Sequence, residues 1–472
     1  MVDFDCNTKM VQVQPPNFTA TKRPTPSILP SPEKFAGEIW TASEQSCSAY
    51  ETYLRLPELR ELWSTTEFPG WENESITKPA LQGLEITFRL ISIVLSDARP
   101  YVNQREWTHR FESLSRDQLE IISILCEEDS TRGTAPIVDL TTSFGSSTEV
   151  WKSCTEHTVV SRGSELSLLP RLATWQKSEG LSSKILFYIE SAMKRCVYTL
   201  GLGEPNLDGK PNLDYDAVCK PSELRNIAWN KIDNYENKVL FLIHQILESW
   251  IFVARQVLAR IGEKINSDEY ITATDHTWVL EKIWNLLQQI ENLHVLMDPD
   301  DFLHLKTQLR MKATSQNDTF CFRSKGLVEI TKMSKDLRHK VPGILGVEVD
   351  PMGGPRIQEA AMRAYREKRE FEKVQLLQAF QGVEVAIKRF YYNYRQLLVV
   401  MLGSLEAKGT TTASFEEDDD LLVQLFMEPT YYPSLDAAKT FIGDFWENDR
   451  TVVVVKGGVP NQLRRSRSRQ GV

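Results

Sequence analysis

Apolar residues recur along most of this chain at the three- and four-residue spacing that places side chains on one face of a helix. The clearest case is residues 237–262, an almost continuously apolar segment. Its inward stripe consists of Leu240, His244, Leu247, Ile251, Ala254, Leu258 and Ile261. The pattern predicts a buried helix with one imidazole on its inward face. Glu248 follows His244 by one turn, where a carboxylate can orient that imidazole.

Two interpretations of His244 follow from this position. The first is a core histidine that hydrogen-bonds to a neighbour, which is how most buried polar side chains are accommodated. The second is a histidine that lines a cofactor pocket. The helix pattern alone fits both, so the rest of the chain has to distinguish them.

The same periodicity predicts further helices over most of the chain after Phe35. They span residues 48–63, 79–100, 115–129, 182–201, 276–297, 298–310, 356–402 and 434–448. Gly382 is the expected weak point of the long segment 356–402, and Gly201 is the expected end of 182–201. His294 and His304 flank the Asp298 corner and are expected at the surface. The fold class is therefore all-α.

Composition divides the chain into four parts. Residues 1–35 are rich in proline and predict a disordered arm. Residues 36–204 form an N-terminal helical region, with a Ser-, Thr- and Gly-rich flexible insertion at about 130–165. Residues 205–450 form a second helical domain, and 451–472 form a basic disordered tail.

Charge and chemistry narrow the class of function. The net charge of −9 gives no general nucleic-acid footprint, and no segment reaches about 18 uninterrupted apolar residues, the length of a membrane span. The acidic N-terminus does not resemble a signal peptide, so a cytoplasmic location is expected. The arginine-rich tail is compatible with nuclear import, so the nucleus is a second expected location. Seven widely spaced cysteines predict reduced thiols and no metal site.

Conventional catalytic motifs are missing from the sequence, which has no P-loop, nucleophile elbow or H-E-x-x-H. A G-L-G turn at residues 201–203 follows a predicted helix instead of a strand, so it does not predict a phosphate site. On these residues alone the chain is an all-α protein of undefined role.

Long, distinctive strings give the chain a family resemblance. They include LPELRELW, YTLGLGEPNLDGKP, HQILESW, CFRSKGLVEITKMSKDLR and EVDPMGGPRIQEAAM. With them, the whole chain resembles the plant nematode-resistance HSPRO family. The resemblance implies a non-enzymatic regulatory protein of plant basal defence and stress response. It also implies that the protein binds the SNF-related energy-sensing kinase through its βγ-type regulatory subunit.

Residues 236–430 also resemble tryptophan 2,3-dioxygenase, an all-α haem enzyme. ENKVLFLIHQILESW is similar to the helix of its distal histidine, and MDPDDFLHLKTQL to the segment that clamps the substrate carboxylate. FYYNYRQLLVVMLG is similar to the helix of its proximal ligand, and KGTTTAS to its substrate-covering loop. This resemblance implies a tryptophan/indoleamine dioxygenase-like core, preceded by an additional N-terminal helical region. The pocket that it implies contains His244, Glu248, Phe302, Lys306, Tyr394, Thr410 and Thr411.

Departures from the dioxygenase pattern argue against its chemistry. The proximal-ligand position holds Tyr394, and a tyrosinate favours ferric haem over the ferrous state that binds O₂. The clamp position holds Lys306, which lacks the bidentate fork of arginine. We therefore expect a pseudoenzyme that needs no cofactor, and no membrane or specific nucleic acid as a partner. The alternative is a haem-binding protein or a divergent oxygenase acting on an indole-like molecule, with haem held by Tyr394 and His244.

Overall fold

The computed structural model describes most of the chain between residues 44 and 456. The described ranges are 44–98, 103–129, 134–138, 149–152, 158–161, 163–205, 209–229, 235–300, 323–348, 356–402 and 425–456. These ranges belong to one compact unit, Ala42–Val472. The predicted arm 1–35 and four of the predicted pocket residues lie outside the described residues.

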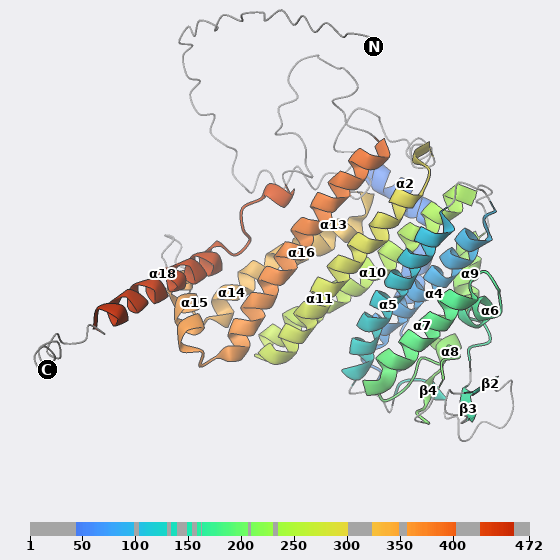
Figure 1. Cartoon of the computed structure of the whole chain (residues 1–472), viewed down its shortest axis with the longest axis horizontal. Helices are drawn as coiled ribbons and strands as arrows, with labels where there is room; N and C mark the ends of the chain where they lie inside the picture. The colour runs from blue at the N-terminus through green and yellow to red at the C-terminus, as the bar shows by residue number, and fades with distance from the viewer. Residues whose placement is uncertain are drawn as a thin grey trace, which may run out of the picture. The chain divides into compact units, whose positions relative to one another are not determined.

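Regular structure in these ranges is almost entirely helical, which confirms the all-α prediction (Figure 1). The first helices are α2 (Glu44–Leu54), α3 (Leu56–Ser64), α4 (Glu74–Ser96), α5 (Gln104–Glu127), α6 (Leu169–Ala173), α7 (Glu179–Ala192), α8 (Tyr215–Cys219) and α9 (Pro221–Trp229). They are followed by α10 (Tyr235–Asn266), α11 (Tyr270–Glu291), α13 (Lys325–Asp336), α14 (Val341–Ile344), α15 (Arg356–Glu367), α16 (Phe371–Leu402) and α18 (Pro433–Lys456). Short 3₁₀ helices are η1 (Met193–Arg195), η2 (Asn292–Leu296) and η5 (Leu337–Lys340).

Short strands occur in and beside the predicted insertion at 130–165. Strand β1 (Ile137–Val138) pairs antiparallel with β4 (Asn212–Leu213), and β2 (Glu149–Lys152) pairs antiparallel with β3 (Thr158–Ser161). The first pairing attaches the start of this segment to the loop that precedes α8.

Helix α10 is the centre of the core. It packs against α4, α11, α13 and α2, and α11 in turn packs along α16, so that α10, α11 and α16 lie side by side (Figure 1). Gly83 allows α4 to approach α10 closely, because a Cβ at this position would lie 3.0 Å from the Trp250 indole nitrogen. Since α4 and α10 come from the two predicted helical regions, both regions share one core.

Helix α4 is the one described helix that is long and apolar enough to cross a membrane. However, 83% of its most apolar window is buried inside the protein. This burial is typical of a core helix, and its packing against α10 accounts for it.

The predicted helix 356–402 is divided at a different place from the one expected. The chain leaves the helix after α15, where Lys368 adopts a left-handed conformation with φ of 52°, and α16 begins at Phe371. Gly382 lies inside α16, against the Trp278 indole of α11. A Cβ at this position would lie only 2.9 Å from the indole ring, so a side chain would not fit there. The expectation of a weak point at Gly382 is therefore wrong; the glycine permits close helix packing instead.

Other helix ends also differ from the predictions: α4 begins at Glu74 and α11 at Tyr270, five and six residues before the predicted starts. Helix α5 begins at Gln104, where the Asn103 side chain caps the Glu106 N–H, so Ser115 lies in the helix interior. Helix α7 ends at Ala192, before Gly201. Helix α18 continues to Lys456, six residues into the segment predicted as a disordered tail.

Candidate functional site

His244 lies on α10 and is buried, with 1% of its surface exposed. Its ring centroid is 5.0 Å from that of His294 in η2 and 6.0 Å from that of Tyr50 in α2. Burial, and then the nearby His294, hold the pKa of His244 well below its ordinary value. The imidazole is therefore neutral near pH 7.

His294 is the second imidazole of this cluster, and the prediction that it lies at the surface is wrong. The side chain is 1% exposed, and its Nδ1 lies 2.7 Å from the backbone oxygen of Glu291 and 3.2 Å from the Glu291 carboxylate. A signal was present, because His294 follows Leu287 by seven residues and Ile290 by four, which is the spacing of the buried helix face.

Glu248 follows His244 by one turn and is also buried. Its carboxylate accepts a hydrogen bond of 3.0 Å from the Tyr50 hydroxyl. Burial raises the pKa of Glu248, although hydrogen bonds from Ser324 and Tyr50 and the charge of Arg60 counteract part of this rise. Glu248 thus connects α10 to the first described helix.

Tyr394 comes to the same cluster from α16. It is 3% exposed and stacks on Phe390 with a centroid distance of 6.3 Å. Burial raises the pKa of Tyr50, followed by the charges of Glu248 and Glu291 and then Tyr394, so Tyr394 lies within electrostatic range of the Tyr50 phenol. The structure therefore brings together His244, Glu248 and Tyr394, three of the predicted pocket residues.

Tyr50 itself was missed by the sequence analysis. A signal was present, because Cys47, Tyr50 and Leu54 have helical spacing and all three are buried. The other predicted pocket residues, Phe302, Lys306, Thr410 and Thr411, lie outside the described residues.

The cluster has the arrangement of a packed polar core. No group of three or more His, Cys, Asp or Glu side chains that can hold a metal ion occurs in the described ranges. His244 contacts the rings of Tyr50 and His294, and Tyr394 stacks on Phe390. In the described residues, protein rings thus pack on both side chains that the haem alternative would use as iron ligands, His244 and Tyr394.

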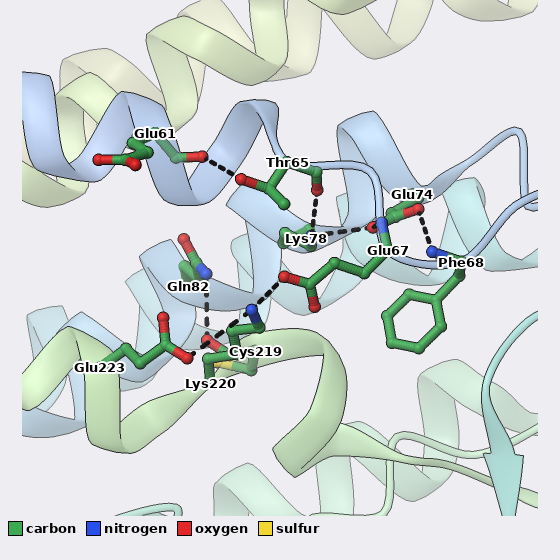
Figure 2. Close-up of polar contacts among 10 residues, drawn as sticks. All are labelled: Glu61, Thr65, Glu67, Phe68, Glu74, Lys78, Gln82, Cys219, Lys220 and Glu223. Carbon is green, nitrogen blue, oxygen red and sulfur yellow. Dashed lines mark hydrogen bonds and ion pairs between the residues drawn. The ribbon is translucent and has the colours of Figure 1, made fainter.

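A second buried polar cluster joins α3, α4 and the turn between α8 and α9 (Figure 2). Its centre is Lys78, which is 1% exposed and lies 2.8 Å from the Glu74 carboxylate. Lys78 also donates a hydrogen bond of 2.6 Å to the backbone oxygen of Thr65. The Glu74 carboxylate accepts the backbone N–H groups of Glu67 and Phe68, so it holds the α3–α4 loop in place.

Lys220 connects this cluster to the α8–α9 turn (Figure 2). The residue is left-handed, with φ of 52°, and its ammonium pairs with Glu67 and, at 3.7 Å, with Glu223. Gln82 of α4 donates a hydrogen bond of 3.1 Å to the backbone oxygen of Cys219. Because every member binds a neighbouring protein group, the cluster fixes loops to helices and does not present a reactive group.

The G-L-G turn also has a structural role. Gly201 has φ of 72°, and the Glu204 carboxylate accepts the N–H groups of Gly201 and Leu202 at 2.9 and 2.7 Å. These two amides are thus bound by the chain's own carboxylate, which agrees with the prediction that the turn is not a phosphate site.

Comparisons with known proteins cover almost the whole chain. The family model described as Hs1pro-1 N-terminus matches residues 1–190, and the model described as Hs1pro-1 protein C-terminus matches residues 193–448. The chain is 50% identical over 455 residues to nematode resistance protein-like HSPRO2 of Arabidopsis thaliana, covering 95% of this chain and all of that protein. It is 50% identical over 451 residues to nematode resistance protein-like HSPRO1 of the same plant, covering 94% of this chain and 99% of that protein. No solved structure matches the chain. With matching models over both halves and full-length relatives at this identity, the chain belongs to the Hs1pro-1 family.

Proposed function

We propose that this protein is a non-enzymatic regulator of plant basal defence and stress response that acts by binding other proteins. The observation that carries the proposal is the 50% identity, over nearly the full length, to two relatives whose names describe nematode resistance. The buried cluster around Tyr50 supports the non-enzymatic part, because its imidazoles and carboxylates are engaged with other protein groups and are closed to solvent.

The proposed partner is the βγ-type regulatory subunit of the SNF-related energy-sensing kinase. The test is co-precipitation of purified full-length chain with that subunit, alongside a variant lacking residues 457–472. We expect both proteins to be retained, because the surface proposed below for a partner lies on α16, outside the deleted residues. The kinase catalytic subunit alone serves as the control and should retain neither. Failure of the regulatory subunit to retain the full-length chain would remove this partner.

The defence role is tested separately in plants. Arabidopsis plants that lack both relatives, HSPRO1 and HSPRO2, would be complemented with this chain and infected with nematodes. We expect fewer established nematodes than in uncomplemented plants. An unchanged infection count at normal protein levels would contradict the defence role, whatever the partner is.

A haem-binding or oxygenase function is the second candidate. One observation favours it, since His244 and Glu248 of α10 and Tyr394 of α16 lie near one phenol. The ring contacts of His244 and Tyr394 oppose it. Haemin titration decides: the proposed function predicts no saturable Soret shift, whereas a shift that is lost in both Tyr394→Phe and His244→Ala would establish the haem alternative.

A further inference from the structure

Helix α16 carries a row of exposed apolar side chains from near its middle to near its C-terminal end. Val385, Tyr392 and Val399 are 54%, 48% and 40% exposed. Their seven-residue spacing keeps them within roughly 40° of one another around the helix axis. Val400 is exposed as well, at 65%. We call Val385, Tyr392, Val399 and Val400 the α16 stripe.

Neighbouring elements border the α16 stripe. The Tyr392 ring meets the Phe426 ring edge-on at 5.3 Å, and Met427, the next residue, is 71% exposed. Lys388 holds this segment against α16 by donating a hydrogen bond of 3.0 Å to the backbone oxygen of Glu428. Near the start of the stripe, Trp278 of α11 is 40% exposed and packs on Gly382. The stripe is therefore a supported helix face with apolar groups on both sides.

The charged residues of α16 after Glu384 are all basic. Residues 385–402 contain Lys388, Arg389 and Arg395 and no acidic residue, although the whole chain has a net charge of −9. Lys388 pairs with Glu384 at 2.7 Å, whereas Arg389 is exposed. A basic, apolar face on an acidic protein favours a partner with the opposite charge.

We propose that the α16 stripe binds an amphipathic helix of a partner protein, whose apolar face is flanked by acidic residues. Helices that dock this way place apolar residues at i, i+3, i+4 and i+7 against an apolar groove. The proposal deepens the partner-binding function above by naming the surface and the chemistry that fits it.

A second copy of this chain fits the stripe less well. An antiparallel pair of α16 helices centred on Tyr392 sets Val385 opposite Val399, which is favourable. The same pairing sets Arg389 opposite Arg395, because both lie three residues from Tyr392. Like charges in direct opposition disfavour such a dimer, and an acidic helix removes the conflict.

The test uses two fluorescent helical peptides of about three heptads. Both carry leucine at the a and d positions; one has glutamate and the other lysine at e and g. Anisotropy would be measured against the full chain and three stripe variants, Val385→Asp, Tyr392→Ala and Arg389→Glu. The control variant is Phe187→Asp, which changes a side chain 61% exposed on α7.

We expect the glutamate peptide to bind at least about tenfold more tightly than the lysine peptide. Val385→Asp and Tyr392→Ala should weaken binding of the glutamate peptide by about tenfold or more, whereas Phe187→Asp should leave this binding unchanged. Arg389→Glu should reduce the preference for the glutamate peptide. Circular dichroism melting of each variant shows whether the fold is kept, and the exposed positions predict that it is.

Several results would overturn the proposal. They are absence of binding, equal binding of the two peptides, or equal loss in Phe187→Asp. A concentration-dependent dimer that Val385→Asp dissociates would assign the stripe to a second copy instead. Because the peptide assay contains no kinase subunit, its outcome is independent of that partner. If the subunit binds the Val385→Asp and Tyr392→Ala variants normally, the surface proposal fails and the proposed function stands.

Discussion

At the scale of single residues, Tyr50 determines how the buried cluster is organised. Its hydroxyl donates to Glu248, and its ring lies against His244, so one side chain of α2 engages two groups of α10. The helical spacing of residues 237–262 predicted that His244 is buried, but no local pattern indicates which distant side chain meets it. Tyr50 and Glu248 are 198 residues apart, and only tertiary packing brings them together.

Removal of the Tyr50 hydroxyl tests this contact. Tyr50→Phe should lower the free energy of unfolding by about 1–3 kcal/mol, because the buried Glu248 carboxylate loses a donor. Tyr392→Phe is the matched control at an exposed tyrosine and should change it by less than about 0.5 kcal/mol. Urea denaturation measures both; equal effects would show that the Tyr50 hydrogen bond contributes nothing specific.

The depressed pKa of His244 predicts a loss of stability in acid. As the pH falls below about 6.5, the unfolded chain protonates this histidine but the folded chain does not. The free energy of unfolding therefore decreases, by up to about 1.4 kcal/mol per pH unit for one such histidine. Glu248 acts in the opposite sense, because its pKa is raised in the folded state and protonation at low pH then favours folding.

Denaturation between pH 7.5 and pH 5 measures this dependence. In His244→Gln, the free energy of unfolding should decrease less with falling pH than in the natural chain. His339→Gln changes a side chain that is 68% exposed and should leave this decrease unchanged. His276 contributes to the decline in every variant, because burial lowers its pKa to about 4. If the free energy of unfolding decreased as steeply in His244→Gln as in the natural chain, His244 would not be a cause of the loss of stability in acid.

At the scale of elements, helix periodicity predicted where most helices lie, and packing determined where several of them end. Gly382 shows the reason. Its low helix propensity predicts a weak point, yet Trp278 requires a residue without a side chain there, and the break occurs at Lys368 instead. The strands at 137–161 were not predicted, because strands of two to four residues are too short to show the alternation of apolar and polar side chains that identifies a strand.

Two glycines distinguish close packing from helix propensity. Gly83→Ala should destabilise the protein by about 1–3 kcal/mol, because the new Cβ would press on the buried Trp250. Gly262→Ala, in α10 with nothing within 4 Å of its Cβ position, should stabilise it by up to about 1 kcal/mol. Thermal melting compares them, and a shift of the same sign in both would refute the role of Gly83.

The buried ion pair that links α3 to α4 gives a further prediction. Lys78→Met should lower the free energy of unfolding by about 3 kcal/mol, because the substitution leaves the Glu74 carboxylate buried without its counter-charge. Adding Glu74→Gln should recover part of this loss. Lys282→Met, at the exposed pair with Glu120, should cost less than about 1 kcal/mol. A small effect of Lys78→Met, similar to that of Lys282→Met, would mean that the cluster in Figure 2 does not hold the loop.

At the scale of the whole molecule, the two predicted helical regions share one core centred on α10, and family membership extends over both. The sequence resemblance anticipated this family from long, distinctive strings. Three of the seven candidate pocket residues could be placed: His244, Glu248 and Tyr394 lie near Tyr50, whereas Phe302, Lys306, Thr410 and Thr411 lie outside the described residues. A partner-binding surface is not encoded by a motif, because it depends on which faces the fold leaves uncovered.

We propose that this protein works by binding a protein partner and not by catalysis. The most direct measurement is isothermal titration calorimetry of the purified full-length chain with the βγ-type kinase regulatory subunit. We expect a saturable heat of binding that Val385→Asp reduces and Phe187→Asp does not. No binding to the subunit, together with a saturable Soret shift on addition of haemin, would contradict the proposal that the protein acts by binding a partner.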